Sequence, residues 1–159
     1  MKKYLIIAVV ALLSISAYGQ DGNSIYKKYS DAQGVSAVYI SPAMFRLMGK
    51  IPEIEVGDGM DIAPLIKSLN GFYLIDSENK SINSDIKKDV DRMLNRGVYE
   101  LLMEVKDNGD IIHIYTVGDK KTITSFLFFA DEPEETTFIS IDGQMPREEL
   151  EKLIAEAMD

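Results

Sequence analysis

The chain has 159 residues, with 26 acidic side chains against 17 basic ones and a formal net charge of −9. This acidity argues against binding to nucleic acids or to anionic membrane surfaces, because both need basic patches. The sequence has no cysteine, which excludes disulfides, cysteine catalysis and a lipid-anchored cysteine, so the fold must depend on its core alone.

Residues 1–19 have the pattern of a cleaved export signal. Lys2–Lys3 give a positively charged start, Tyr4–Ile15 is a short apolar run, and Ala17–Gly19 supplies small residues at the cleavage positions. We expect cleavage before Gln20 and export to the periplasm or the extracellular space. A membrane anchor is the alternative, but the apolar run is shorter than the ~20 residues that span a bilayer.

The expected mature chain, residues 20–159, has the size of one domain. Removal of 19 residues and their two lysines leaves 140 residues, with 15 basic and 26 acidic side chains and a net charge of −11. A chain of about this length buries roughly 68–70% of the surface that it exposes when unfolded. No internal repeat or long linker divides it, so we expect a single domain.

Predicted helices and short strands alternate in the first part of this domain. Asn23–Gln33 has the apolar spacing of a helix, and Val35–Ile40 alternates as a strand. Ser41 is a helix cap and Pro42 suits the first helical position, so a short helix is expected up to Gly49.

Residues 50–60 are predicted to form an irregular acidic loop. A calcium site is the alternative, but the acidic residues lack the alternate spacing of a calcium-binding helix–loop–helix motif. Asp61 is the expected cap of a helix over Ile62–Asn70, which Gly71 would end. A strand over Phe72–Asp76 and a long amphipathic helix over Ser81–Arg96 complete this part.

Four consecutive strands are predicted in the second half, over residues 98–106, 110–117, 122–130 and 136–142. Asn108-Gly109 between the first two favours a type I′ hairpin turn, which needs positive φ at both central residues. The third strand is apolar on both faces at its end and should be central. An amphipathic helix beginning at Met145-Pro146 closes the chain. This order predicts an α+β fold, with a largely antiparallel sheet, a C-terminal four-strand meander and helices mainly on one face.

Several segments of the mature chain carry a family pattern. Val38–Phe45 is a strand running into a helix, Leu65–Gly71 precedes another strand, and Tyr99–Gly109 and Ile139–Gly143 punctuate the meander. In these segments the chain resembles the domain of unknown function 4252 family, small exported proteins of Bacteroidetes-type bacteria. The resemblance covers essentially the whole mature chain and implies no activity, cofactor or catalytic residue. Some relatives carry a lipidation cysteine after the signal, and this chain has none.

Catalytic motifs are sparse. His113 is the only histidine, so neither a nucleophile–histidine–carboxylate triad in a recognisable motif nor a two-histidine zinc site is indicated. No phosphate-binding glycine loop is present. We therefore expect no metal and no cofactor. A pair of carboxylates doing acid–base work stays open as an alternative, although 26 acids give no means of choosing the pair.

One face of the predicted sheet is the candidate binding surface. If Leu101, Met103, Val105, Ile112, Ile114, Leu127, Phe129, Ile139 and Ile141 face the helices, large aromatic side chains gather on the opposite face, where they would mark a partner or dimer surface. The candidates are His113, Tyr115, Phe126, Phe128 and Phe138. The alternative is that helices cover this face too and these residues are core.

The function that we expect from the sequence is non-catalytic binding by an exported envelope protein, through a protein partner or self-association. A hydrolase using a carboxylate pair and a structural or signalling component of the bacterial envelope are the alternatives.

Overall fold

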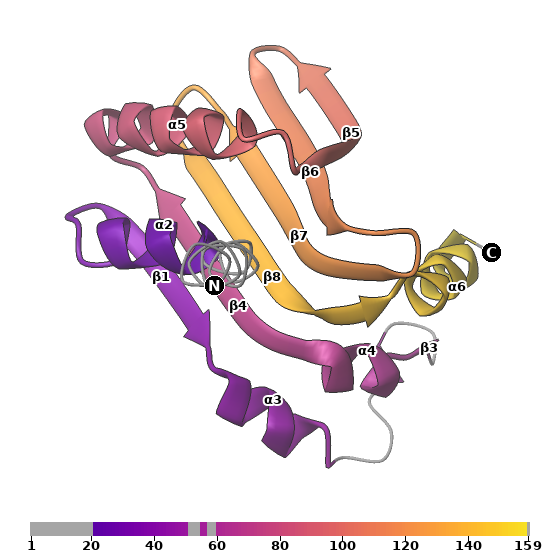
Figure 1. Cartoon of the computed structure of the whole chain (residues 1–159). Helices are drawn as coiled ribbons and strands as arrows, with labels where there is room; N and C mark the ends of the chain where they lie inside the picture. The colour runs from indigo at the N-terminus through magenta and orange to yellow at the C-terminus, as the bar shows by residue number, and fades with distance from the viewer. Residues whose placement is uncertain (1–20, 51–54, 57–59, 159) are drawn as a thin grey trace, which may run out of the picture.

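A six-stranded antiparallel sheet forms the centre of the computed structural model, which describes residues 21–50, 55–56 and 60–158 (Figure 1). The expected export signal and most of the acidic loop over 50–60 lie outside the described residues. From edge to edge the strands are β1 (Val35–Ile40), β4 (Leu69–Ser77), β8 (Thr136–Pro146), β7 (Thr122–Asp131), β6 (Asp110–Gly118) and β5 (Glu100–Asp107). The short strands β2 (Glu55–Val56) and β3 (Met60–Asp61) pair separately.

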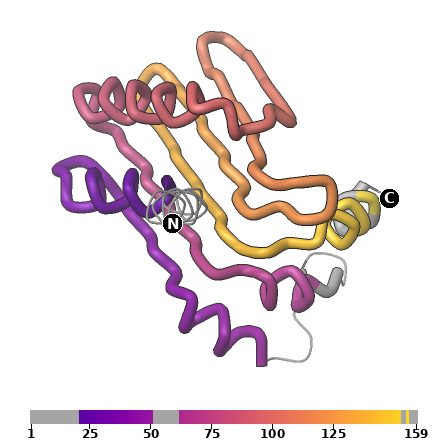
Figure 2. Tube along the Cα trace, viewed as in Figure 1, coloured from indigo at the N-terminus to yellow at the C-terminus, as the bar shows by residue number. Residues whose placement is uncertain are grey.

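The four-strand meander is confirmed. Strands β5 to β8 are consecutive neighbours in the sheet, and β7 lies inside it between β6 and β8, as its apolar sequence predicted. Asn108 and Gly109 both have positive φ, 47° and 102°, as the type I′ turn requires. The β5–β6 hairpin projects beyond the other strands (Figure 2). Its register shifts between Leu101 and Met103, so the outer strand carries a β-bulge.

Two helices pack on one face of the sheet, α2 (Asp21–Tyr29) and α5 (Lys80–Leu94) (Figure 1). Both are amphipathic, because their apolar side chains recur at helical spacing and turn toward the strands. The core between them and the sheet is a cluster of nine buried residues: Ile25, Tyr29, Ile75, Ile86, Val90, Met93, Leu127, Phe129 and Phe138. The predicted α+β class, with its helices on one face of the sheet, is therefore confirmed.

The remaining helices lie toward the other end of the strands: α3 (Pro42–Met48), α4 (Ala63–Ser68) and α6 (Arg147–Met158) (Figure 1). Ser41 caps α3 as predicted, since its side chain accepts a hydrogen bond from the backbone N–H of Met44. In the part of the chain that the structure describes, no helix has both the length and the apolar character to cross a bilayer.

The predicted helix over Ile62–Asn70 is wrong in its bounds and its cap. Asp61 belongs to β3, and Ile62 holds the cap position without a side-chain hydrogen bond. Leu69 and Gly71 pair with β8, so backbone pairing within the sheet ends the helix before the glycine. The same kind of pairing extends β8 beyond the predicted end at 142 as far as Pro146, which lies opposite Thr122, and α6 begins one residue later.

Asn79 caps the N-terminus of the long helix α5, and its replacement tests how much this cap stabilises the fold. Its side-chain oxygen accepts from the N–H groups of Ser81 and Ile82, while its amide nitrogen donates to the carbonyl of Gln33. We expect Asn79→Ala to lower the free energy of unfolding by about 1 kcal/mol. Asn79→Ser keeps a cap but loses the link to Gln33, so it should recover most of that loss in urea unfolding. Equal losses in the two variants would contradict the cap's role.

Candidate functional site

The five candidate residues from the sequence do not share a face. His113 lies opposite Phe129, which in turn lies opposite Phe138, and residues directly opposite each other across a ladder point to the same side. Phe129 and Phe138 are in the core under the helices, and Tyr115 packs against that core. His113, Tyr115 and Phe138 are therefore on the helix-covered face.

Phe126 and Phe128 are the two candidates that lie on the opposite face. They alternate along β7 with the buried Leu127 and Phe129, so they point away from α2 and α5. The expectation that Phe138 belongs with them on an open face is wrong: its side chain has no exposed surface. That expectation assumed that one set of side chains faces the helices together: Leu127, Phe129, Ile112, Ile114, Ile139 and Ile141. The last four lie opposite Ala130, Phe128 and Phe126 and share their face.

The face away from the helices carries an uninterrupted row of apolar side chains across all six strands. Each member lies directly opposite the next across one ladder of the sheet. In order from β1 to β5, this apolar row is Val38, Leu74, Ile139, Phe128, Ile114 and Met103. None of the six is buried, and the two ends of the row are 46% and 52% exposed.

Two shorter rows flank it on the same face. Beyond Ala130 of β7 the same face is polar, and there Thr137 donates a hydrogen bond to Asp76. Of the two shorter apolar rows, one contains Ile40, Phe72, Ile141 and Phe126, and the other contains Ile112 and Val105. All six of these side chains also keep exposed surface. We call the twelve side chains of the three rows the open face. Contiguous apolar surfaces of this kind are candidate interaction sites.

The burial pattern shows that the helices cover one face of the central strands and leave the other. Along β4 and β7 buried residues alternate strictly with half-buried ones over most of the strand. A face covered by a second layer would bury both sets. The described residues thus leave the open face in contact with solvent. A partner that bound there would remove its apolar side chains from water.

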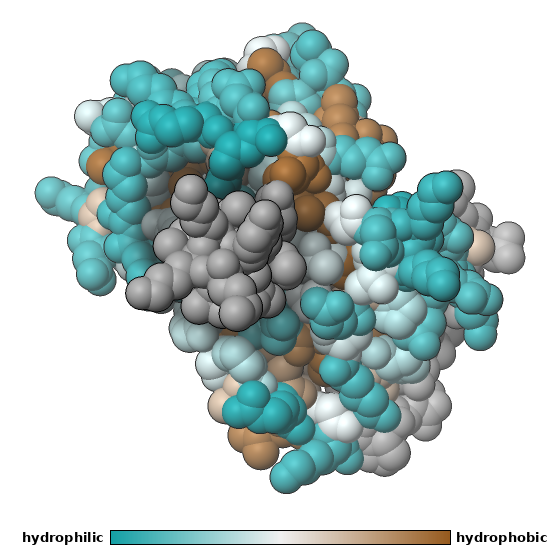
Figure 3. All heavy atoms as spheres, viewed as in Figure 1, coloured by the Kyte–Doolittle hydropathy of each residue, from teal (hydrophilic) through white to brown (hydrophobic). Residues whose placement is uncertain are grey.

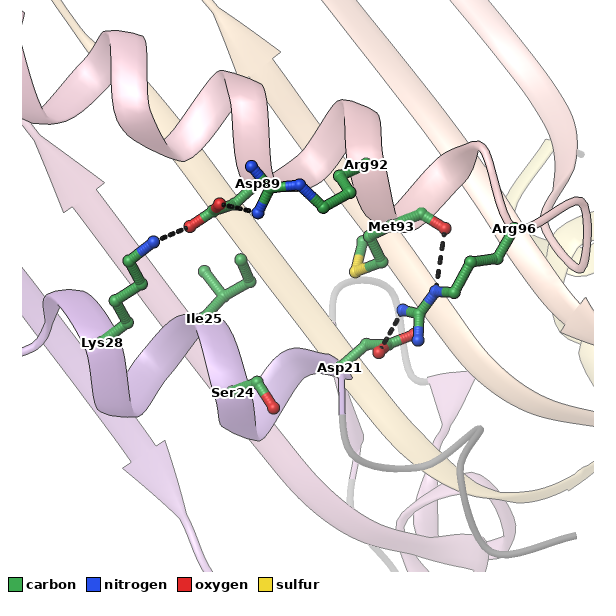
Figure 4. Close-up of a pocket in the computed structure, with 8 residues that line it drawn as sticks. All are labelled: Asp21, Ser24, Ile25, Lys28, Asp89, Arg92, Met93 and Arg96. Carbon is green, nitrogen blue, oxygen red and sulfur yellow. Dashed lines mark hydrogen bonds and ion pairs between the residues drawn. The ribbon is translucent and has the colours of Figure 1, made fainter. Parts of the chain in front are cut away.

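On the helix side, charged residues bridge α2 and α5 (Figure 4). Asp89 of α5 accepts hydrogen bonds from Lys28 and from the hydroxyl of Tyr29, at 2.6 Å for the latter, and from Arg92 at 2.8 Å. Partial burial opposes the charge, but the hydrogen bonds from Lys28 and Tyr29 outweigh it and lower the pKa of Asp89. A carboxylate held ionised in this way links the two helices rather than donating a proton.

Asp21 holds the other end of the same groove. It pairs with Arg96 and accepts a hydrogen bond from the hydroxyl of Tyr99, and burial together with this bond raises the pKa of Tyr99. The groove between the helices has a volume of about 440 Å³ and is open to solvent. Hydrophilic side chains dominate the surface of α5, and hydrophobic ones show over the strands beyond it (Figure 3). Both carboxylates of the groove, those of Asp21 and Asp89, form ion pairs with basic side chains.

A buried carboxyl group lies beneath the start of α2. Asp142 of β8 is 5% exposed and accepts hydrogen bonds from the hydroxyls of Ser125 at 2.9 Å and Ser140 at 3.3 Å. Gly22 packs so closely on Ser140 that an added Cβ would lie 2.5 Å from its side chain. Burial raises the pKa of Asp142 to about 6, and the negative charge of Asp21 adds to the effect.

His113 pairs with a carboxylate at the margin of the helix-covered face. Its Nε2 lies 2.7 Å from a carboxylate oxygen of Glu104, which also binds Lys106 at 2.9 Å. The described residues contain no group of three His, Cys, Asp or Glu side chains arranged to hold a metal ion. No serine or threonine hydroxyl among the described hydrogen bonds joins this histidine. The pair is a surface contact between neighbouring strands.

Comparison with protein families gives a match over residues 28–153 to the family described as Domain of unknown function (DUF4252). The chain belongs to this family. The match covers nearly all of the sheet and its helices and confirms the resemblance seen in the sequence. Neither the curated proteins nor the solved structures include a significant match. Membership assigns no activity, so the function must be argued from the surface of the molecule.

The two phenylalanines assigned to opposite faces can be distinguished by truncation. Phe138→Ala removes a fully buried ring and should lower the free energy of unfolding by about 3–5 kcal/mol. Phe128→Ala removes a half-buried ring from the open face and should cost clearly less, because water already reaches that site. Urea unfolding of both variants is the measurement, and equal losses would contradict the assignment of the faces.

The raised pKa of Asp142 predicts a dependence of stability on pH. Its ordinary pKa of 3.8 applies in the unfolded chain, and about 6 applies in the folded one. The folded protein thus binds the proton more tightly, and its free energy of unfolding falls by up to about 3 kcal/mol as the pH rises from about 4 to 6. Asp142→Asn cannot titrate, so we expect it to gain stability relative to the parent over this range. Parallel curves for the two proteins in pH-dependent urea unfolding would contradict the assignment.

Proposed function

We propose that this protein is a non-catalytic binding module of the bacterial envelope and that it binds through the open face of its sheet. The observation that carries the proposal is the apolar row, which crosses six strands without a charged or polar member. A soluble domain gains nothing in stability from exposing such a row, whereas a partner that covers it gains from removing it from water.

The location in the envelope rests on residues 1–19. Their two lysines, apolar run and small residues before Gln20 are those of an export signal, and we propose that the chain is secreted to the periplasm or beyond. The lack of cysteine is compatible with folding there, since the described core needs no covalent staple. The net negative charge of the chain favours solubility of the exported protein, although one face of its sheet is apolar.

Electrostatics also favours binding over acid–base chemistry. A hydrolase with two carboxylates needs one acid with a raised pKa at an open pocket and a second carboxylate opposite it. Asp142, whose pKa is raised, is almost completely buried, and the open groove between the helices holds Asp89 with a lowered pKa. The pKa of Glu135 is also raised, by its hydrogen bond to Asp76, but Glu135 lies in the connection between β7 and β8 and does not line that groove. The arrangement supports a stable scaffold beneath α2 and α5 and leaves the opposite face for recognition.

The size of the protein in extracts of cells that export it tests this function. We expect the product of the full-length sequence to elute as a complex larger than one chain. The double variant Val38→Lys/Met103→Lys should elute as a single chain, because it places charges at both ends of the apolar row. Both positions are at least 46% exposed, so lysine fits the isolated fold.

The matched control is Tyr39→Lys/Leu101→Lys. Tyr39 is next to Val38 on β1, Leu101 is two residues before Met103 on β5, and the two are 46% and 49% exposed. Both point to the helix side, where the Tyr39 ring stacks on Tyr73 at 5.2 Å and Leu101 lies opposite Tyr115. The control should elute with the parent. A parent protein that elutes as a single chain would overturn the proposed function.

A further inference from the structure

We propose that the start of α2 is a pH-dependent latch, which docks on β8 while the carboxyl group of Asp142 is neutral and is released when that group ionises. The contact that carries the proposal is that of Gly22 with Ser140, because it holds the start of α2 over the carboxyl group. The latch lies on the helix-covered face and is independent of binding through the open face.

The partners of Asp142 suit a neutral acid better than a carboxylate. Its side chain is almost completely buried, and the described hydrogen bonds to it come from the hydroxyls of Ser125 and Ser140, which both donate to Oδ1. A buried carboxylate needs a cation or several strong donors to replace the water that it has lost. Two neutral hydroxyls on one oxygen supply much less, so burial here favours the protonated group.

The other titratable groups around Asp142 either add to this preference or stay neutral. Asp21 of α2 carries a negative charge that opposes the ionisation of Asp142. Tyr73 of β4 and Tyr99, which precedes β5, both have raised pKa values, so their phenols stay uncharged at neutral pH. The positive charge of Arg96 is already paired with Asp21. Ionisation of Asp142 therefore adds a second carboxylate to a contact whose arginine is already paired.

α2 is the part of this contact that can move. Asp142 and its two serine partners belong to β7 and β8, which have a paired strand on each side. α2 has nine residues, and its described backbone hydrogen bonds stay within the helix and the turn that follows it. An element held by side-chain contacts alone opens at a smaller free energy than inner strands do. Repulsion beneath the first turn therefore acts on α2 before it acts on the sheet.

The direction of the pH effect follows from the pKa of Asp142, which is about 6 in the folded protein against an ordinary value of 3.8. Release of α2 returns the carboxyl group to water, so the docked state binds the proton more tightly than the released state. The proton favours docking fully below about pH 4, and this advantage is lost as the pH rises through about 6. Between about pH 5 and pH 7 the population of released α2 should rise roughly tenfold.

Hydrogen exchange of the exported product of the full-length sequence, followed by NMR at the amides of residues 25–30, is the test. Protection factors are compared, because they remove the intrinsic rise of the exchange rate with pH. We expect α2 to be less protected than β7 at both pH values, since it opens separately from the sheet. Its protection factors should fall roughly tenfold from about pH 5 to pH 7.

Asp142→Asn keeps an oxygen for the two serine hydroxyls and cannot ionise. The protection of α2 in this variant should be the same at both pH values. The matched control is Asp91→Asn, which removes an exposed carboxylate from α5 and should keep the fall seen in the parent. Circular dichroism of each variant shows that the fold is retained.

Three outcomes would overturn the latch. The first is equal protection of α2 and β7 in the parent, because the helix would then open only with the whole fold. The second is separate opening of α2 with the same protection at both pH values. Neither of these measurements needs a variant. The third is a fall with pH that persists in Asp142→Asn, because another group would then carry the titration.

Discussion

The ladder between β4 and β8 is the interaction on which the rest of the structure depends. It pairs a strand from the first half of the chain with the last strand of the meander, from Leu69 opposite Gly143 to Ser77 opposite Thr136. Without it, β1 and β4 would be a separate hairpin-like pair and the meander a four-stranded sheet with an open inner edge. Its register also aligns Leu74 with Ile139, which continues the apolar row from one half of the chain into the other.

Local patterns predicted the parts of this sheet, and long-range pairing decided how they combine. The meander, the Asn108-Gly109 turn and the cap at Ser41 each follow from neighbouring residues, so the sequence was sufficient for them. The extent of β4 and β8 depends on pairing between residues that are far apart in the chain, from Leu69 with Gly143 to Ser77 with Thr136. The local sequence alone makes Gly71 a plausible end of the preceding helix. Only the pairing of Leu69 and Gly71 with β8 shows that the strand begins before this glycine.

The candidate site was harder to predict for a related reason. Apolar residues occupy both faces of β6, β7 and β8, so alternation separates the two sets within each strand but does not say which set the helices cover. His113, Tyr115 and Phe138 were therefore grouped with Phe126 and Phe128, although the register places them on the other side. The edge strand β5 was misleading in the same way, because Met103 and Val105 alternate with Glu104 and Lys106 as if the apolar pair faced the helices. The bulge after Leu101 turns Met103 and Val105 to the open face instead.

The bulge in β5 has a consequence for how large an assembly of this chain could become. An unpaired edge of eight residues invites further strands, and repeated addition at an edge produces filaments. Here the strand is bent between Leu101 and Met103, and Glu104 and Lys106 stand beside the bend. Bends and charges of this kind discourage edge pairing. Growth of the sheet at this edge is thus opposed by the chain itself.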